Sequence, residues 1–228
     1  MSRDCTRVAL LLVFLAALCA RGAAKTDAGF HYLDPAQIDL TVWLPPPPDV
    51  GSALERDDEE RVAAEVATRN SSQFALAKAA SQRSVFFFAD SIGTQFKPSR
   101  FPITDAFFGR VESDVEKLVD LAKVYWGRPR PSGAAKKRGS YPSGHAAFAA
   151  STAILLAQLV PCKREQIFGQ ARTYAENRIV LGLHYPSDVA AGWTAGTVAV
   201  FAMMRNPAFE RDFAATKAEL QKECSPAH

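Results

Sequence analysis

Two segments of the chain, 146–160 and 189–204, contain no charged residue and are apolar almost all the way round a helical projection. A helix without a polar face is stable in water only when other elements cover all of its sides. The segments have fifteen and sixteen residues, short of the roughly 20 that span a bilayer. They therefore predict buried central helices of a bundle and no membrane span.

Other parts of the chain show apolar residues at intervals of three and four, which predicts helices over about 56–80, over 81–92 and over part of 103–125. In the first of these, one face carries Val62, Val66 and Ala67. In the third, the spacing comes from Val111, Val115, Leu118, Val119 and Ala122. No strand-length alternation bounded by turn signals and no internal repeat is present. The sequence predicts an all-α, compact, single-domain helical bundle.

The amino terminus has the pattern of a secretory signal peptide. Arg3 and Arg7 precede an apolar run over 8–20, and small residues follow at 22–24. A membrane anchor is the alternative, but thirteen apolar residues are too few to span a bilayer. We therefore expect residues 1–24 to be cleaved and the protein to be periplasmic or secreted.

The chain contains four cysteines, two of which, Cys5 and Cys19, lie in the predicted signal peptide. Lipidation at Cys19 is disfavoured because Leu18 before it is larger than such a cleavage site tolerates. Cys162 and Cys224 remain, in a compartment where disulfides persist. They form either a disulfide or two unpaired buried thiols, and spacing alone does not decide between these.

The rest of the chain divides into two regions. Residues 25–50 are polar and proline-rich, and they end in four consecutive prolines at 45–48. Such a run favours a stiff polyproline conformation, so we expect a surface strap that leads into the globular body. Residues 51–228 are expected to form the helical domain.

The net charge limits the partners. The chain has 27 Lys and Arg against 24 Asp and Glu, a formal charge of +3. Loss of the signal peptide leaves 24 basic and 23 acidic residues, or +1. A nucleic-acid polymer or an anionic lipid surface needs many clustered cations. Any anion binding must therefore be local.

Three short clusters of polar residues carry the candidate chemistry. In the first, Lys123 ends a predicted helix, and Arg128 and Arg130 each precede a proline. The prolines favour extended backbone, on which residues two apart point the same way. Both arginines are thus expected to face one anion, with Lys123 approaching from the helix end. The alternative is a basic surface turn.

In the second cluster, Ser143 is placed to cap the helix that begins near Ala146. The free N–H groups of its first turn, including that of Gly144, would then point at an anion over the helix end. The alternative is plain capping with an incidental His145.

The third cluster consists of Arg178, His184 and Asp188. Asp188 lies four residues after His184, so near-helical backbone would let its carboxylate accept from Nδ1–H. Nε2 would then be available as a nucleophile or base. The alternative is a structural histidine. Taken together, the three clusters fit the binding of a tetrahedral oxyanion.

At these residues the sequence resembles the type 2 phosphatidic acid phosphatase superfamily, whose pattern is Lys-x6-Arg-Pro, Pro-Ser-Gly-His and Ser-Arg-x5-His-x3-Asp. The three parts fall at 123–131, 142–145 and 177–188. One departure is Asn177 where the family has Ser, which we expect to change a hydrogen bond beside Arg178 without abolishing activity. The leading Tyr32-Leu33, the run at 44–48 and the closing segment 207–209 are similar to the secreted bacterial class A non-specific acid phosphatases.

The resemblance implies the fold of the acid phosphatases and vanadium haloperoxidases and hydrolysis of small phosphomonoesters with broad specificity. It implies that His184 is the nucleophile, that His145 is the general acid and base, and that Asp188 orients His184. The implied phosphate-binding residues are Lys123, Arg130, Ser143, Gly144 and Arg178. No metal or cofactor is implied, and phosphate or vanadate is expected to bind as product or inhibitor. Two imidazoles in opposite protonation states predict a bell-shaped, acid-shifted rate profile.

Three other functions remain open. A vanadate-dependent haloperoxidase uses a similar pocket, in which the histidine binds vanadate. A serine acyl hydrolase would use Ser143, His184 and Asp188, but it lacks a Gly-x-Ser-x-Gly elbow and leaves the cations without a role. A non-catalytic phosphate-binding module would not need two histidines. Homo-oligomerisation is also left open by the sequence.

Overall fold

The computed structural model describes residues 29–131 and 138–224. The predicted signal peptide lies outside these residues. Every regular element in the described part is helical, which confirms the all-α prediction. None of the helices described there is both long enough and apolar enough to cross a bilayer.

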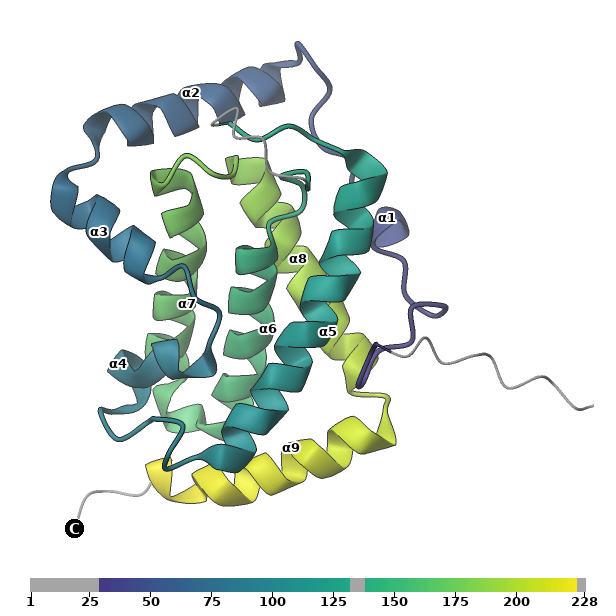
Figure 1. Cartoon of the computed structure of the whole chain (residues 1–228), viewed down its shortest axis with the longest axis vertical. Helices are drawn as coiled ribbons and strands as arrows, with labels where there is room; N and C mark the ends of the chain where they lie inside the picture. Colours follow the sequence, from purple (N-terminus) through teal and green to yellow (C-terminus); the bar gives the residue numbers. More distant parts are fainter. Residues whose placement is uncertain (1–28, 132–137, 225–228) are drawn as a thin grey trace, which may run out of the picture.

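The central element is α6 (Gly144–Leu159), which is flanked by α5 (Pro102–Trp126), α7 (Arg164–Val180) and α8 (Pro186–Met203) (Figure 1). Thirteen of the sixteen residues of α6 are buried, as its apolar sequence predicts. The same prediction is wrong for α8, which buries one side only and leaves Phe201 67% exposed. Helix α8 lies against α6 but borders solvent on its other side.

Two glycines of α8 allow the closest helix contact in the site region. A Cβ atom on Gly192 would lie 2.3 Å from the carbonyl oxygen of Ser143, and one on Gly196 would lie 2.2 Å from that of Ala147. Any larger residue would push the helices apart. The small side chains therefore bring the amino-terminal ends of α6 and α8 together.

The region 56–92 differs from its prediction. The expected helix over 56–80 is divided into α2 (Ala53–Thr68) and α3 (Ser71–Ala79). The break occurs because the Asn70 side chain accepts from Gln73 N while the Gln73 side chain accepts from Asn70 N, a capping box that starts a new helix. Of the expected apolar face of α2, only Val62 is buried.

The expected helix over 81–92 is also wrong in part. Residues 81–84 are a loop, followed by a 3₁₀ turn, η1 (Val85–Phe88), and a single turn, α4 (Ala89–Ile92). The Ser84 side chain caps the turn by accepting from Phe86 N. The loop at 81–84 is important because it borders the site described below.

The carboxyl-terminal half contains two helices that the sequence analysis did not predict. Helix α7 has buried residues at helical spacing, but many polar residues lie between them and obscure the pattern. Helix α9 (Pro207–Leu220) crosses the end of the bundle opposite α2 (Figure 1). By contrast, α5 matches its prediction closely, with all five of its predicted apolar residues buried.

The strap is more than a surface segment. It contains a short helix, α1 (Leu40–Trp43), and it buries Tyr32, Leu33, Ile38, Leu40 and Leu44. The Asp114 carboxylate of α5 accepts from the backbone N–H groups of His31, Tyr32 and Leu33. The strap is therefore anchored in the core by apolar side chains and by one buried carboxylate.

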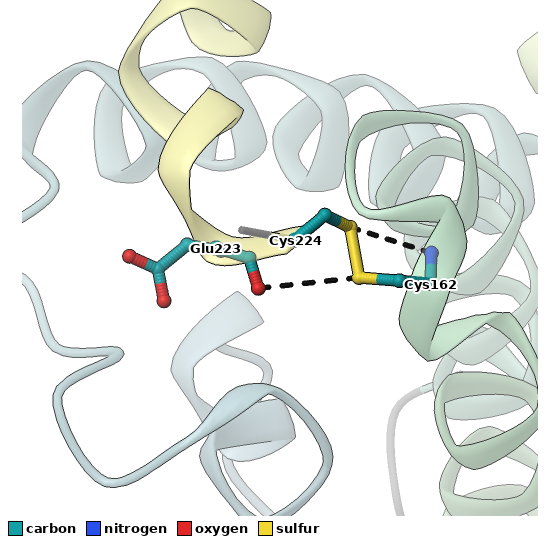
Figure 2. The surroundings of a disulfide bond; sticks show 3 residues. All are labelled: Cys162, Glu223 and Cys224. Atoms are coloured by element: carbon teal, nitrogen blue, oxygen red, sulfur yellow. Dashed lines mark hydrogen bonds between the residues drawn. A yellow bond between two sulfur atoms is a disulfide. The ribbon is translucent and has the colours of Figure 1, made fainter. Parts of the chain in front are cut away.

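A disulfide joins Cys162 and Cys224 (Figure 2). Cys162 lies in the 3₁₀ turn η2 (Pro161–Lys163) after α6, and Cys224 ends η3 (Gln221–Cys224) after α9. The bond ties the end of α9 to the bundle. It lies at the carboxyl-terminal end of α6, so it belongs to the scaffold and not to the region around His184.

Candidate active site

The second and third sequence clusters meet at one end of the bundle. The backbone N–H of Ser143 donates to the carbonyl oxygen of Asp188 at 2.9 Å, which fixes the start of α6 beside the start of α8. The Ser143 side chain accepts from Ala146 N at 3.4 Å and caps α6, as predicted. Gly144 is buried in the first turn, where free N–H groups and the helix dipole favour an anion.

His184 is 2% exposed and lies beside this helix end. Its Nε2 is 2.9 Å from Arg130 Nη1. Because a guanidinium group only donates, Nε2 must be the acceptor and the ring hydrogen must lie on Nδ1. Burial, reinforced by the charges of Arg130 and Lys123, lowers the pKa of His184 to about 4. The imidazole is therefore neutral at mildly acidic and neutral pH.

Asp188 is fully buried beside His184. Its Oδ2 lies 3.4 Å from His184 Nδ1, but the two groups are not aligned for a hydrogen bond. Tyr185 N donates to Oδ2 at 2.9 Å, and Arg128 Nη1 donates to Oδ1 at 2.7 Å. Burial alone would raise the pKa of Asp188, but His184 and Arg128 outweigh it and lower the pKa. The carboxylate is thus held charged beside the ring.

Arg128 does not face the anion site, so the prediction that both arginines of the first cluster point the same way is wrong. Its side chain is buried between two carboxylates, with Nη2 2.9 Å from Asp58 Oδ2 and Nη1 on Asp188. Its guanidinium also lies over the Tyr185 ring at 4.1 Å. Burial would lower the pKa of Arg128, but Asp188 and Asp58 raise it. The two carboxylates thus hold Arg128 away from the pocket.

Lys123, Arg130 and Arg178 come together as predicted, around His184. The Nε atoms of Arg130 and Arg178 are buried and have no hydrogen-bond acceptor among the described residues. Burial lowers the pKa of Lys123 to about 8, with further effects from Arg130 and Arg83, and that of Arg178 to about 10. Burial also lowers the pKa of Arg130. All three side chains remain charged in acid, so an anion bound between them would accept hydrogen bonds from their N–H groups.

His145 lies in the first turn of α6, on another side of the same pocket. Its Nε2 is 3.0 Å from the carbonyl oxygen of Ser81, which can only accept, so Nε2 carries a hydrogen. The ring stacks on Tyr174 at a centroid distance of 5.9 Å. Burial and the charges of Arg178 and Arg83 lower the pKa of His145 to about 2. The ring is therefore neutral when the pocket is empty, and a bound anion would raise its pKa.

Sequence reasoning missed three residues around this site. Asp58 reaches it from α2, whereas Ser81 and Arg83 come from the loop that was expected to be helical. None of them belongs to a recognisable motif, and only the folded chain brings them near His184. Elsewhere, a surface hollow of about 350 Å³ lies between α2, α7 and α8, and its lining includes Arg172 and Trp193 but no predicted site residue. Among the described residues, no three His, Cys, Asp or Glu side chains are grouped as a metal site.

This geometry can be compared with known proteins. Residues 115–212 match the model of the PAP2 superfamily. The matched segment covers less than half of the 228 residues. It is 28% identical over 222 residues to an acid phosphatase of Zymomonas mobilis, an alignment that covers 90% of this chain and 83% of the relative. It is 27% identical over 229 residues to a non-specific acid phosphatase of Salmonella typhi, covering 92% and 91%.

A solved structure confirms the fold. The crystal structure of a transmembrane PAP2 type phosphatidylglycerolphosphate phosphatase from Bacillus subtilis matches with a TM-score of 0.50 and 19% identity, covering 68% of this chain and 86% of that one. The segment that matches the PAP2 superfamily model includes all of the predicted catalytic and phosphate-binding residues. Asp58, Ser81 and Arg83 lie outside the matched segment.

Proposed function

We propose that the protein is a phosphatase that hydrolyses phosphomonoesters through a phosphohistidine formed on His184. The observation that carries this proposal is the pair of buried Nε–H groups of Arg130 and Arg178, which have no acceptor among the described residues and lie around a neutral histidine. Buried donors of this kind are costly unless a ligand accepts from them. The acid phosphatases among the relatives support the same function.

In the first step, Nε2 of His184 attacks phosphorus in line, so that an N–P bond forms as the bond to the leaving oxygen breaks. Arg130 Nη1 then donates to a phosphate oxygen in place of Nε2. Asp188, held by Arg128, stabilises the positive charge that develops on the ring. The low pKa of His184 keeps its lone pair available in acid.

Lys123, Arg130 and Arg178 are proposed to bind the non-bridging oxygens, together with the Ser143 hydroxyl and the Gly144 amide. These donors are fixed by folding, so they stabilise the charge of the transferring group without reorganisation. Ser143 acts here as a donor and a helix cap. The capping geometry does not favour the acyl-hydrolase alternative, and no hydrogen bond joins Ser143 to His184 in the described part of the chain.

His145 is proposed to protonate the leaving alcohol and then to take a proton from the water that hydrolyses the phosphohistidine. Because Ser81 fixes the hydrogen on Nε2, the exchanged proton would be carried on Nδ1. The negative charge of bound phosphate offsets Arg178 and Arg83, which raises the pKa of His145 when substrate is present. Substrate binding thus favours the protonated form of His145, which acts as the general acid.

Broad specificity, independence of metals and a periplasmic or secreted location are parts of the same proposal. The location is supported by the disulfide, which persists in oxidising compartments. Phosphate and vanadate are expected to inhibit by occupying the oxyanion site.

The decisive experiment measures phosphate released from p-nitrophenyl phosphate by the purified protein at pH 4–7, with and without EDTA. Quenching in alkaline SDS, which preserves the acid-labile N–P bond, should trap a phosphorylated wild-type protein, and His184→Ala should give no phosphorylated protein. Bromide oxidation in the presence of vanadate and peroxide, without ester hydrolysis, would instead establish the haloperoxidase alternative. Phosphate binding without either activity would establish the binding module.

A further inference from the structure

The loop over residues 81–84 forms a wall of the pocket on the side of His145. The carbonyl oxygen of Ser81 accepts from His145 Nε2, and its hydroxyl accepts from Arg178 Nη1 at 3.4 Å. The next carbonyl, that of Gln82, accepts from the hydroxyl of Tyr174 at 3.2 Å. Since His145 is the group proposed to protonate the leaving oxygen, this loop borders the leaving group.

Arg83 extends from this loop towards the start of α6. A Cβ atom placed on Gly144 would lie 3.4 Å from Arg83 Nη1 and 3.5 Å from Lys123 Nζ. The guanidinium therefore lies beside the amide and the lysine that are proposed to bind phosphate. The side chain of Arg83 is 21% exposed, against 10% for that of Lys123. Arg83 is thus a fourth cation, placed nearer to the rim.

Two carboxylates of α5 fix the orientation of Arg83. Its Nε lies 2.9 Å from Glu112 Oε1, and its Nη2 donates to Glu116. These contacts alone would be explained by anchoring of the loop to α5. They do not use Nη1, which has no acceptor among the described residues and is the nitrogen beside Gly144. The carboxylates therefore leave one donor edge of a fixed guanidinium directed at the pocket.

The other three cations suffice for the phosphate. Lys123 and Arg178 are buried and Arg130 contacts His184 directly, whereas a phosphomonoester carries at most two negative charges there. A fourth cation at the rim, on the side of the leaving group, is placed for negative charge elsewhere on the substrate.

We propose that Arg83 is a specificity-determining residue that binds a second anionic group, a carboxylate or a further phosphate, on the leaving group of the substrate. The inference rests on the proposed phosphatase function. It predicts that the enzyme favours phosphate esters of alcohols that carry a carboxylate or a further phosphate. Esters of uncharged alcohols with the same carbon skeleton should be poorer substrates.

The test compares 3-phosphoglycerate with glycerol 3-phosphate, which share three carbons and a terminal phosphate but differ in a carboxylate. In Arg83→Gln, kcat/KM for 3-phosphoglycerate should fall about tenfold, mainly through KM, because one charged hydrogen bond is lost. For glycerol 3-phosphate it should fall less than about threefold. Pyrophosphate against phenyl phosphate provides a second pair with a phosphate as the second anion.

Two control variants separate binding from folding. Glu116→Gln weakens the anchor of the loop but retains the Arg83 charge, so it should keep the preference for 3-phosphoglycerate. Arg100→Gln removes an exposed arginine paired with Glu223 and should leave both substrates unaffected. Thermal unfolding of all three variants monitors stability.

The outcomes are distinct. Equal losses on both members of each pair, or a loss of preference in Glu116→Gln matching that in Arg83→Gln, would show that Arg83 only anchors the loop and would overturn the inference. If Arg83→Gln kept the wild-type preference for 3-phosphoglycerate over glycerol 3-phosphate, the inference would also be overturned. A wild-type protein that hydrolyses none of the four substrates would instead overturn the proposed function, and this inference with it.

Discussion

Arg128 and Arg130 are separated by a single proline, yet they lie in opposite environments. Arg128 is buried between Asp58 and Asp188, and both of its terminal nitrogens have carboxylate partners. Arg130 donates to two carbonyl oxygens and contacts the neutral ring of His184, and its Nε has no partner in the described part of the chain. An arginine whose terminal nitrogens are both paired with carboxylates supports the structure, whereas one that keeps an unpaired N–H group at the pocket is available to a ligand.

The same contrast extends to the two charge networks. Beside the pocket, Asp58, Arg128 and Asp188 form an ion-pair network whose Asp188 end contacts His184. In the pocket, Lys123, Arg130 and Arg178 form a cationic cluster. Burial lowers the pKa of all three, and Arg130 and Arg83 lower those of Lys123 and Arg178 further. Stability is expected to depend on the first network and anion binding on the second.

The largest effect is expected at the point where the two networks meet. His184→Ala removes the proposed nucleophile, so kcat should fall by about 10⁴-fold or more. The fold should persist, because a small neutral side chain replaces a neutral ring. Steady-state hydrolysis of p-nitrophenyl phosphate measures the loss of turnover, and trapping of the phosphorylated protein in alkaline SDS measures the loss of the intermediate. A variant that still becomes phosphorylated would show that another residue is the nucleophile.

The pair Arg130→Met and Arg128→Met tests the comparison directly. Arg130→Met should lower kcat/KM by about 10³-fold, since a cation that contacts the transferring group is lost, and should change the free energy of unfolding by less than about 1 kcal/mol. Arg128→Met leaves two buried carboxylates unpaired, so it should destabilise the fold by about 3–5 kcal/mol. Urea unfolding measures the free energy of unfolding of both variants, and steady-state kinetics measure their kcat/KM. Equal destabilisation by the two changes would contradict the distinction.

The pH dependence distinguishes the networks further. Protonation of His184 removes its lone pair. For p-nitrophenyl phosphate, whose leaving group needs little protonation by His145, kcat/KM should therefore rise with pH through the pKa of about 4 in the free enzyme. Arg130 is one of the charges that lower this pKa, so Arg130→Met should raise it towards the ordinary value. An NMR titration of the ring measures the shift in both proteins. An unchanged pKa would show that Arg130 does not act on the ring.

The same shift affects stability. The unfolded imidazole has a pKa near 6.5 and binds its proton first as pH falls. The contribution of His184 to the free energy of unfolding is therefore complete above about pH 6.5 and decreases as pH falls towards 4. Unfolding curves at several pH values should show this slope, and His184→Ala should reduce it.

The smallest effect is expected at Asp58, the end of the ion-pair network that is farthest from His184. Asp58→Asn keeps the side-chain size but removes the negative charge that faces Arg128. It should therefore lower the free energy of unfolding by about 1–3 kcal/mol. Asp188 still holds Arg128, so kcat/KM should stay within about threefold of wild type. A loss of activity as large as that of Arg130→Met would show that Asp58 acts on the reacting groups.

Several features followed from local patterns. The all-α class, the helix at 102–126 and the buried α6 could be predicted because apolar spacing and the absence of a polar face are properties of short segments. The grouping of Lys123, Arg130, Arg178 and His184 followed from motif spacing and family resemblance. Helices α7 and α9 were missed because polar residues interrupt their apolar pattern, and the break at Asn70 depended on a capping box within an otherwise helical stretch.

The sequence by itself determined which residues could bind an oxyanion and that helices would carry them. Only the tertiary structure decided which of those residues face it. Extended backbone predicted the same direction for Arg128 and Arg130, but Asp58, seventy residues earlier in the chain, pairs with one and not the other. Arg83 reached the pocket in the same way, through a loop fixed by Glu112 and Glu116. Charge pairing between distant segments depends on how the helices pack, so it cannot be predicted from the pattern of residues within one segment.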